Sequence, residues 1–164
     1  KKKKKSMQKR ILIPTDFNVE SLNTMKRALE RVDDGDVEVI LFYSEYLSDS
    51  ITEMLFYNPE KRLNELITPV FEEALTILVN RYEKLCLSVN IELFHYNNGM
   101  AFKNYVEAKS IDLVFIPKNY TLSPLKNGFD PIPVMKEANI PLQEVSWENN
   151  SEEVYEDSLG YLFI

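Results

Sequence analysis

The sequence predicts an α/β protein with an open, doubly wound sheet of five parallel strands and helices on both faces. Strand patterns alternate with helical patterns along the chain, which is typical of parallel strands joined by helical crossovers. The runs at 11–13 and 111–116 are almost wholly apolar, as expected of strands buried on both faces. The run at 88–95 instead alternates apolar and polar residues, which indicates an exposed face or a sheet edge.

The first strand and helix contain the first candidate site. An apolar run at 11–13 forms the strand, and Pro14 ends it because proline has no N–H to donate to a neighbouring strand. Thr15 and Asp16 therefore fall in the loop at the carboxyl end of this strand, where open α/β sheets bind ligands. Asn18 is expected to cap the helix that follows. The apolar residues of that helix recur at helical spacing: Leu22, Met25, Ala28, Leu29 and Val32.

The remaining elements follow the same alternation. Further strands are expected at 37–43, 88–95, 111–116 and 141–147, and helices at 60–67, from 69 onward, at 100–109 and at 134–139. Thr68 is expected to cap the helix that starts at Pro69, and a single helix kinked at Pro69 is the alternative. Residues 44–58 show no regular pattern, and residues 117–133 form a long polar loop.

Composition and charge favour a single globular domain and argue against nucleic-acid-binding and membrane-spanning proteins. The 164 residues suit a single domain with its own core, and a net charge of −7 argues against nucleic acid as a partner. No run approaches the roughly 18 apolar residues of a membrane span. The lone Cys86 lies between leucines, which favours a small buried side chain over a nucleophile. A single cysteine also fits a reducing compartment, so we expect a cytoplasmic protein.

Three segments of the chain differ in composition. Residues 1–8 form a basic tail that is either disordered or artificially added, and Met7 is a candidate native start. Residues 9–147 form the predicted domain. Residues 148–164 form an acidic tail with an apolar end.

Three stretches resemble the universal stress protein family. ILIPTDFNVESLNTMKRAL is similar to the start of that family, in which a strand ends in P-T-D-F. SIDLVFIPKN is similar to a later family strand, and VMKEANIPLQEV resembles the closing segment. The resemblance covers residues 9–147 in order and spacing. It implies a Rossmann-like or flavodoxin-like sheet with the strand order 3-2-1-4-5.

The family's ATP-binding members carry a glycine-rich loop, G-x2-G-x9-G-(S/T), after the fourth strand. Alignment on the fourth strand places Pro117 and Tyr120 at the first two glycines, and alignment on the closing segment places Gly128 at the third, followed by Phe129. Pro117 has no N–H for a phosphate, and the Tyr120 ring would occupy the space that a phosphate needs. The sequence therefore predicts a degenerate ATP-binding motif and no cofactor.

The resemblance still implies a vestigial nucleotide pocket. Its residues would be Pro14, Thr15, Asp16, Phe42, Lys118 and Gly128. In ATP-binding relatives, the residue that matches Asp16 helps to hold the nucleotide. The structural alternative is that Asp16 is a loop carboxylate that accepts hydrogen bonds from nearby backbone N–H groups.

Catalytic and metal-binding residue sets are not evident. His95 is the only histidine and lies at the end of the third predicted strand, so we interpret it as a surface or hydrogen-bonded residue at the strand end. One histidine and one cysteine provide no zinc site. Asp33, Asp34 and Asp36 resemble a cation site, but they fall at the amino-terminal end of the sheet, so we interpret them as a solvated turn.

These observations leave three functional hypotheses. The first is a non-enzymatic, non-ATP-binding domain that acts in a stress response through self-association or partner binding. The second is an ATP or AMP sensor that uses Asp16 and a remodelled loop at 117–128. The third is a phosphoacceptor module of the response-regulator type, which would require more acidic residues beside Asp16 than this sequence places there.

A homodimer is the expected assembly. Phe56, Tyr57 and the tail aromatics Tyr155, Tyr161 and Phe163 lie where burial within one monomer is not evident, and aromatic residues are enriched at interfaces. The alternative is that the tail folds back onto its own sheet. Gln143 and Glu144 make the last strand more polar than in relatives that pair through this edge.

Overall fold

A computed structural model describes residues 8–32, 35–85 and 87–147. The predictions for Cys86, Asp33, Asp34, residues 1–7 and the acidic tail from residue 148 lie outside the described residues. None of the helices in the described part of the chain has the length and apolar character that a membrane crossing requires.

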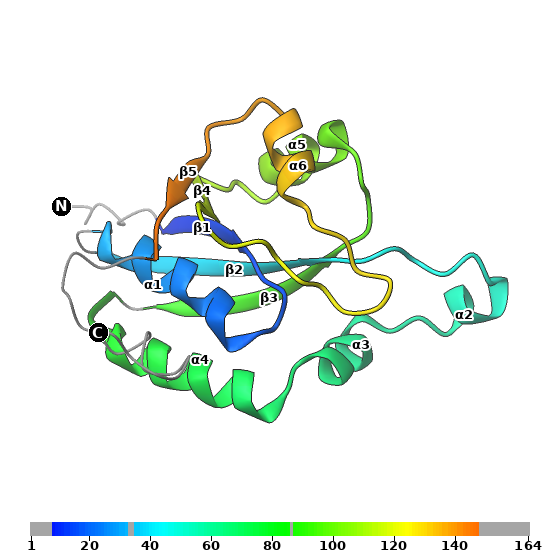
Figure 1. Ribbon diagram of the computed structural model, residues 1–164, viewed down its shortest axis with the longest axis horizontal. Coiled ribbons are helices and arrows are strands. Elements are labelled where there is room, and N and C mark those ends of the chain that lie inside the picture. The colour runs from blue at the N-terminus through cyan, green and yellow to red at the C-terminus, as the bar shows by residue number, and fades with distance from the viewer. Residues whose placement is uncertain (1–7, 33–34, 86, 148–164) are drawn as a thin grey trace, which may run out of the picture.

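The structure confirms the predicted sheet. Five parallel strands lie in the order β3-β2-β1-β4-β5, which is the order expected from the sequence (Figure 1). The strands are β1 (Lys9–Pro14), β2 (Val37–Ser44), β3 (Ser88–Phe94), β4 (Leu113–Pro117) and β5 (Gln143–Val145). β1 is central, with Ile11 opposite Val39 of β2 on one side and Leu113 of β4 on the other. β3 pairs only with β2, which explains its alternating sequence.

Helices cover both faces of the sheet (Figure 1). One face packs against α1 (Leu22–Glu30) and α4 (Pro69–Arg81), and the other packs against α5 (Gly99–Ala108) and α6 (Ile132–Glu137). Because side chains alternate along a strand, Ile11 and Ile13 of β1 join the first core, whereas Leu12 joins the second. The apolar run of β1 therefore supplies both cores, as its composition predicted.

One of the two predicted helix caps differs from the sequence prediction. Asn18 precedes a short 3₁₀ turn (Val19–Ser21) and its side chain makes no capping hydrogen bond. The Asn18 carbonyl oxygen instead accepts the Ser21 hydroxyl at 2.8 Å. Ser21 is the residue before α1, and its side chain makes no capping hydrogen bond either. The start of α4 agrees with the prediction, because Thr68 Oγ1 accepts the Phe71 N–H at 3.1 Å.

The segment between β2 and α4 contains two separate helices. α3 (Pro59–Leu66) begins at Pro59, with Asn58 accepting the N–H groups of its first turn, so this proline starts a helix. Ile67 is extended between α3 and α4, which rules out one kinked helix. The segment that lacked a sequence pattern forms α2 (Ile51–Leu55), which projects away from the sheet (Figure 1).

One lysine side chain of helix α1 is fully buried. Lys26 of α1 has 0% exposure. Burial lowers the pKa of Lys26 from 10.5 to about 8, because a charged ammonium is poorly solvated inside a protein. The unfolded chain therefore keeps this proton at pH values at which the folded chain has released it.

The fold predicts a pH-dependent stability that Lys26 controls. Between pH 7.5 and 9 the unfolded chain binds more protons at Lys26 than the folded chain does, so the free energy of unfolding should rise with pH by about 1 kcal/mol. Urea unfolding of the native protein and of Lys26→Met at both pH values would measure this difference. Lys26→Met should remove the rise, and Lys84→Met, at an exposed lysine, should retain it. An equal rise in Lys26→Met would contradict the assignment.

Candidate functional site

The candidate site lies at the carboxyl end of β1, where Asp16 is 2% exposed. Its carboxylate accepts three hydrogen bonds. Oδ1 accepts the Asn18 N–H at 3.0 Å, and Oδ2 accepts the Tyr120 hydroxyl at 2.5 Å and the Ser123 N–H at 2.9 Å. Two of these donors come from the loop after β4, so this loop covers the carboxylate. Asp16 is therefore a hydrogen-bonded loop residue, as the structural alternative for it predicted.

Tyr120 is held on both its hydroxyl and its ring. Burial, followed by the neighbouring Asp16 carboxylate, raises the pKa of Tyr120, so the hydroxyl remains a donor at neutral pH. Its ring centre lies 4.3 Å from that of Trp147, with the ring planes 32° apart. Trp147 Nε1 in turn donates to Thr24 Oγ1 of α1 at 2.9 Å. These contacts connect the loop after β4 to the residues after β5 and to α1.

Thr15 stabilises the turn between β1 and α1. Thr15 Oγ1 accepts the Phe17 N–H at 3.1 Å and lies 2.9 Å from Ser21 Oγ. Phe17 adopts a positive φ of 64°, and its ring packs against Tyr43 and Phe71 at 4.8 and 5.3 Å. Thr15 is 3% exposed, so its hydroxyl is used inside the turn.

The other members of the expected pocket lie in different environments. Pro14 is the last residue of β1 and is paired with Phe42. The Phe42 side chain belongs to the core on the α5 and α6 face, 4.9 Å from the Phe94 ring. Lys118 is exposed, and its backbone N–H donates to the Val145 carbonyl oxygen at 2.9 Å. The structure brings Thr15 and Asp16 together with Tyr120, which the family pattern does not include.

Gly128 is needed for a close approach between the loop and β2. It forms an isolated antiparallel bridge with Glu45, and its N–H donates to the Leu125 carbonyl oxygen at 2.8 Å. A Cβ atom at this position would lie 2.6 Å from the Tyr43 hydroxyl and 2.7 Å from Pro124 Cβ. The Tyr43 hydroxyl also accepts the Leu125 N–H at 3.0 Å. Gly128 therefore has a packing role that requires no phosphate.

A second polar cluster lies at the carboxyl ends of β2 and β3. Glu45 is 4% exposed, and Arg62 of α3 donates to both of its oxygens, at 2.7 Å in the shortest contact. His95 Nδ1 lies 3.0 Å from the Glu45 carbonyl oxygen, and Nε2 lies 3.0 Å from the Tyr57 hydroxyl. Both ring nitrogens of His95 thus have partners, as the interpretation of a hydrogen-bonded strand-end residue predicted.

Sequence reasoning did not find Tyr120 as a partner of Asp16, nor Trp147 as the support for Tyr120. The sequence predicts for Tyr120 only that its ring fills the space that a phosphate needs. The sequence contains one tryptophan, which lies two residues after the end of the last strand. A single large aromatic side chain at the carboxyl end of a parallel sheet is the signal that could have indicated a covered site.

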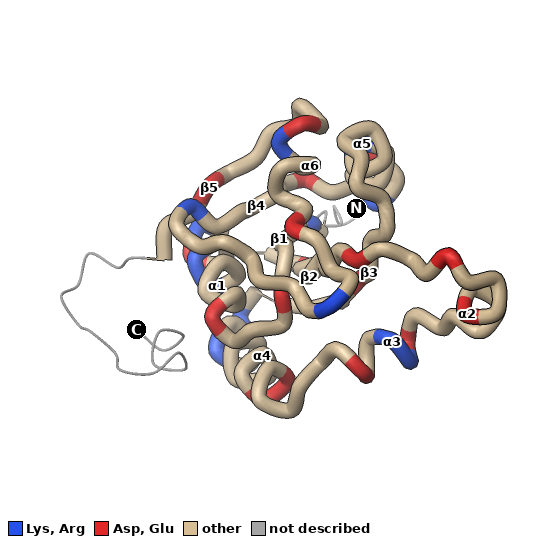
Figure 2. The backbone as a smooth tube through the Cα atoms, turned by 45° about the vertical axis from the view of Figure 1, so that its right-hand side comes forward, with Lys and Arg blue, Asp and Glu red and all other residues tan. Residues whose placement is uncertain are grey.

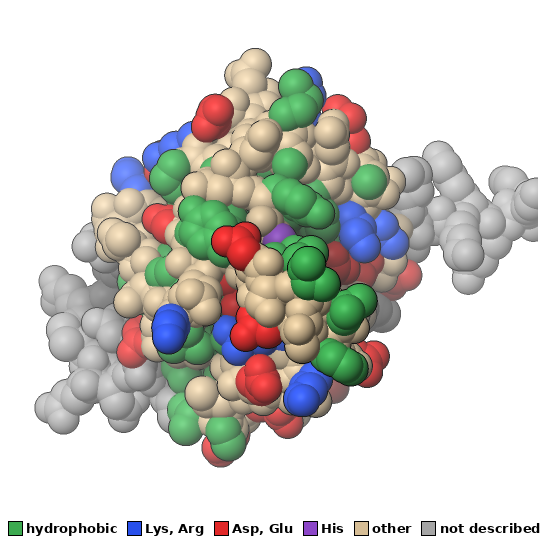
Figure 3. Space-filling model, turned by 90° about the vertical axis from the view of Figure 1, so that its right-hand side faces the viewer, with side chains coloured by type: hydrophobic (Ala, Val, Ile, Leu, Met, Phe, Trp, Pro, Cys, Tyr) green, Lys and Arg blue, Asp and Glu red, His purple; other side chains and the backbone are tan. Residues whose placement is uncertain are grey.

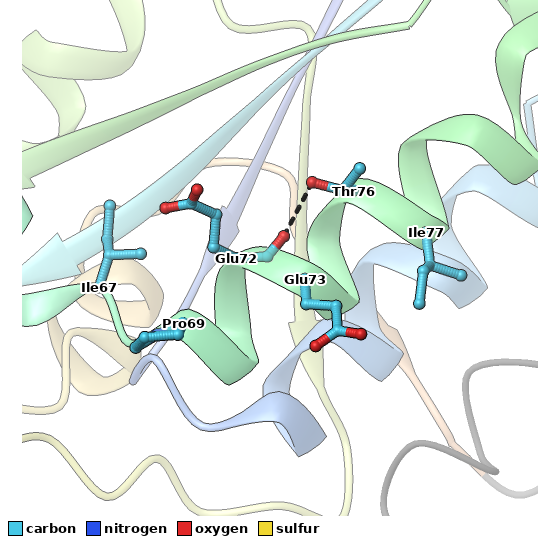
Figure 4. A pocket seen from close by; sticks show the side chains of 6 residues that line it. All are labelled: Ile67, Pro69, Glu72, Glu73, Thr76 and Ile77. Atoms are coloured by element: carbon cyan, nitrogen blue, oxygen red, sulfur yellow. Dashed lines mark hydrogen bonds between the residues drawn. The ribbon is translucent and has the colours of Figure 1, made fainter.

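The described residues show no metal site. Among residues 8–32, 35–85 and 87–147, no group of three His, Cys, Asp or Glu side chains could hold an ion. A hollow on the outside of α4 contains Glu72 and Glu73, whose carboxylates point in different directions (Figure 4). There Thr76 Oγ1 donates to the Glu72 carbonyl oxygen at 2.9 Å, so the hydroxyl already has a partner (Figure 4).

Comparisons with known proteins find similar structures at low identity. The universal stress protein UspA from Lactobacillus plantarum is 14% identical, with a TM-score of 0.48 over 84% of this chain and 96% of that chain. The hypothetical protein MJ0577 is 22% identical, with a TM-score of 0.47 over 87% and 98%. A universal stress protein family member from Burkholderia pseudomallei is 13% identical, with a TM-score of 0.42 over 86% and 98%. No family model and no curated protein matches the sequence.

The hydrogen bond from Tyr120 to Asp16 should stabilise the fold. Tyr120→Phe removes the hydroxyl and keeps the ring against Trp147, so the free energy of unfolding should fall by about 1–3 kcal/mol, as for a hydrogen bond to a charged group. Chemical denaturation would measure this loss. In an Asp16→Ala background the same substitution should cost clearly less, because the partner is already absent. Equal costs in both backgrounds would show that the two side chains are not coupled.

The close packing at Gly128 predicts a second stability effect. Gly128→Ala should lower the free energy of unfolding by about 1–3 kcal/mol, because the new methyl group would overlap the Tyr43 hydroxyl and Pro124. Thermal unfolding of Gly128→Ala alone and combined with Tyr43→Phe would test the cause. Gly128→Ala should cost less stability in the Tyr43→Phe background than in the native chain, with Tyr43→Phe alone as the reference because it also loses the hydrogen bond from the Leu125 N–H. A Gly128→Ala protein as stable as the native chain would disprove the packing role.

Proposed function

We propose that this chain is a universal stress protein-like domain that does not bind ATP and is not an enzyme. It acts in a stress response through self-association or through binding a protein partner. The family assignment is supported by the three sequence segments that resemble universal stress proteins and by the strand order that the resemblance implied. A cytoplasmic location is supported by the single cysteine.

The observation that carries the proposal is that three hydrogen-bond donors of the protein already occupy the carboxylate of Asp16. A nucleotide that used Asp16 at this end of the sheet would have to displace the Tyr120 hydroxyl and the Ser123 N–H from the carboxylate. Both donors would then lack an acceptor. Pro117 provides no N–H for a phosphate oxygen in return. Opening the loop therefore costs hydrogen bonds and offers the triphosphate fewer donors than a glycine-rich loop would.

The absence of an enzymatic function is supported by the placement of the titratable groups. His95 has a partner on each ring nitrogen and lies at the end of the edge strand β3, whereas Asp16 follows the central strand β1. A Ser-His-Asp or Cys-His mechanism needs a nucleophile beside a free imidazole nitrogen. The contacts of His95 do not offer that arrangement.

A nucleotide sensor is the second candidate, because Lys118 and Lys126 are exposed on the loop that covers Asp16. These two lysines could attract a phosphate if the loop opened. In that case Asp16 would hold adenylate only after Tyr120 had moved away. The two candidates therefore differ in what Asp16 contacts when nucleotide is present.

Titration with labelled ATP in the presence of magnesium separates the two candidates. We expect no saturable binding below millimolar ATP, and the same result for Asp16→Ala, because the native carboxylate is already occupied. Tyr120→Phe, which keeps the ring against Trp147 and removes the hydrogen bond to Asp16, is the control for destabilisation of the loop and should also show no binding. Micromolar, magnesium-dependent binding that Asp16→Ala abolishes would overturn the proposal and favour the sensor.

A further inference from the structure

A cavity of about 460 Å³, which we call the α2–α3 hollow, lies between helices α2 and α3. The chain around α2 forms one wall, α3 forms the other, and Glu45 and Asn127 complete the lining. Ligand pockets commonly measure roughly 300–1,000 Å³, so the hollow has room for a small organic molecule. Neither Asp16 nor Tyr120 lines it, so it is separate from the candidate site at β1. Figure 3 faces this end of the molecule and shows acidic, basic and hydrophobic side chains close together there.

The wall on the side of α2 presents exposed apolar side chains. Met54 is 53% exposed and Phe56 is 80% exposed, and both line the α2–α3 hollow together with Tyr46 and Tyr57. Both ends of this wall are fixed to the domain. The Tyr46 N–H donates to a carbonyl oxygen of the loop after β4 at 2.8 Å, and the Tyr57 hydroxyl lies 3.0 Å from His95 Nε2. The wall therefore holds apolar surface in a defined position, which lowers the entropy cost of binding the apolar part of a ligand.

The opposite wall contains an arginine whose position is fixed by a buried carboxylate. Glu45 is 4% exposed, and Arg62 of α3 donates to it from Nε at 2.9 Å and from Nη2 at 2.7 Å. Glu65 accepts from Nη1 at 3.3 Å. A guanidinium has five N–H donors, so one N–H on Nη1 and one on Nη2 have no acceptor among the described residues. These two N–H groups form a planar fork, which matches the two oxygens of a carboxylate.

Two opposite charges line the α2–α3 hollow without an ion pair. Lys61 lies on α3 beside Arg62, and Glu53 lies on α2. Among residues 8–32, 35–85 and 87–147, neither Lys61 nor Glu53 forms a salt bridge. Figure 2 shows the acidic residue of α2 and the basic residues of α3 on the two sides of the space between these helices. A ligand with both a cation and an anion would match both side chains, whereas one of them would repel a ligand of a single sign.

We propose that the α2–α3 hollow binds a small zwitterion with an apolar body, of which a free apolar amino acid is the simplest example. The carboxylate of this ligand accepts from Lys61 and from the two outer N–H groups of Arg62. Its ammonium pairs with Glu53, and its apolar side chain covers Met54 and Phe56. The inference goes beyond the proposed function, because it assigns a small-molecule ligand to a part of the chain that the proposed function does not use.

Three related compounds test whether the hollow recognises both charges of a zwitterion. Calorimetric titration of the full chain with L-phenylalanine should show saturable binding with a Kd of about 0.1–1 mM, as for a ligand of about twelve heavy atoms. Phenethylamine lacks the carboxylate and 3-phenylpropanoate lacks the ammonium, so each should bind about tenfold more weakly, because each loses charge-assisted hydrogen bonds. The inference would be overturned if L-phenylalanine showed no saturable binding up to about 10 mM. It would also be overturned if either single-charge compound bound as tightly as L-phenylalanine.

Single substitutions assign each charge of the ligand to one residue. Lys61→Ala should weaken L-phenylalanine about tenfold and should not weaken phenethylamine, because phenethylamine has no carboxylate. Glu53→Gln should weaken L-phenylalanine about tenfold and should not weaken 3-phenylpropanoate, which has no ammonium. Lys103→Ala and Glu107→Gln on α5, which do not line the α2–α3 hollow, are the matched controls and should bind as the native chain does. Native affinity in Lys61→Ala or in Glu53→Gln would contradict the inference.

The position of the ligand can be measured independently of its affinity. In ¹⁵N-labelled protein, L-phenylalanine should shift the backbone amide signals of residues 45–65 and leave those of Asp16 and Tyr120 unchanged. Shifts centred on Asp16 would overturn the assignment. Arg62 is not substituted, because its loss would leave the buried Glu45 carboxylate without its partner. The ATP titration concerns the carboxylate of Asp16, so either proposal can fail without the other.

Discussion

The arrangement of this domain depends on the buried carboxylate of Asp16. A carboxylate this far from water is costly unless hydrogen-bond donors surround it. The turn after β1 supplies one donor, the N–H of Asn18, and the loop after β4 supplies the other two. Satisfying Asp16 therefore brings a loop without helices or strands across the mouth of the sheet. Trp147 then supports Tyr120 from the far side, so the residues after β5 are positioned by the same carboxylate.

The sheet could be predicted because its signals are local. The apolar run of β1, the alternation in β3 and the Thr68-Pro69 helix start each reflect a preference that a short segment carries by itself. The covered site could not be predicted in the same way. The partner of Asp16 is 104 residues away in the chain, and the path of its loop depends on tertiary contacts that no periodicity encodes. The missing side-chain cap at Asn18 has a related cause, because a 3₁₀ turn follows the positive φ of Phe17, and in that turn the Asn18 carbonyl oxygen accepts the N–H and the hydroxyl of Ser21.

Gly128 matches a glycine of the family pattern that the sequence resembles, but its neighbours here are protein groups. The family pattern places a glycine here so that a backbone N–H can approach a phosphate. In this chain the Gly128 N–H donates to the Leu125 carbonyl oxygen, and the space that a side chain would fill contains the Tyr43 hydroxyl. The requirement for glycine is therefore preserved by a protein contact. A motif search that counts glycines would miss this difference, because the partner that excludes a Cβ atom is a tyrosine on β2.

The closed mouth and the projecting arm, by which we mean residues 46–57 with α2, lie on the same side of the sheet, at the carboxyl ends of its strands (Figure 1). The loop after β4 joins them: Tyr120 of this loop closes over Asp16, and Asn127 of the same loop holds the base of the arm. Closing the ligand site and supporting the arm are thus two effects of one loop conformation. Under the proposed function, this linkage explains how a fold that usually binds small molecules at this end can present a protein-binding element there. The hydrogen-bond acceptors of Asp16 at the mouth are occupied, whereas the apolar side chains of α2 are exposed.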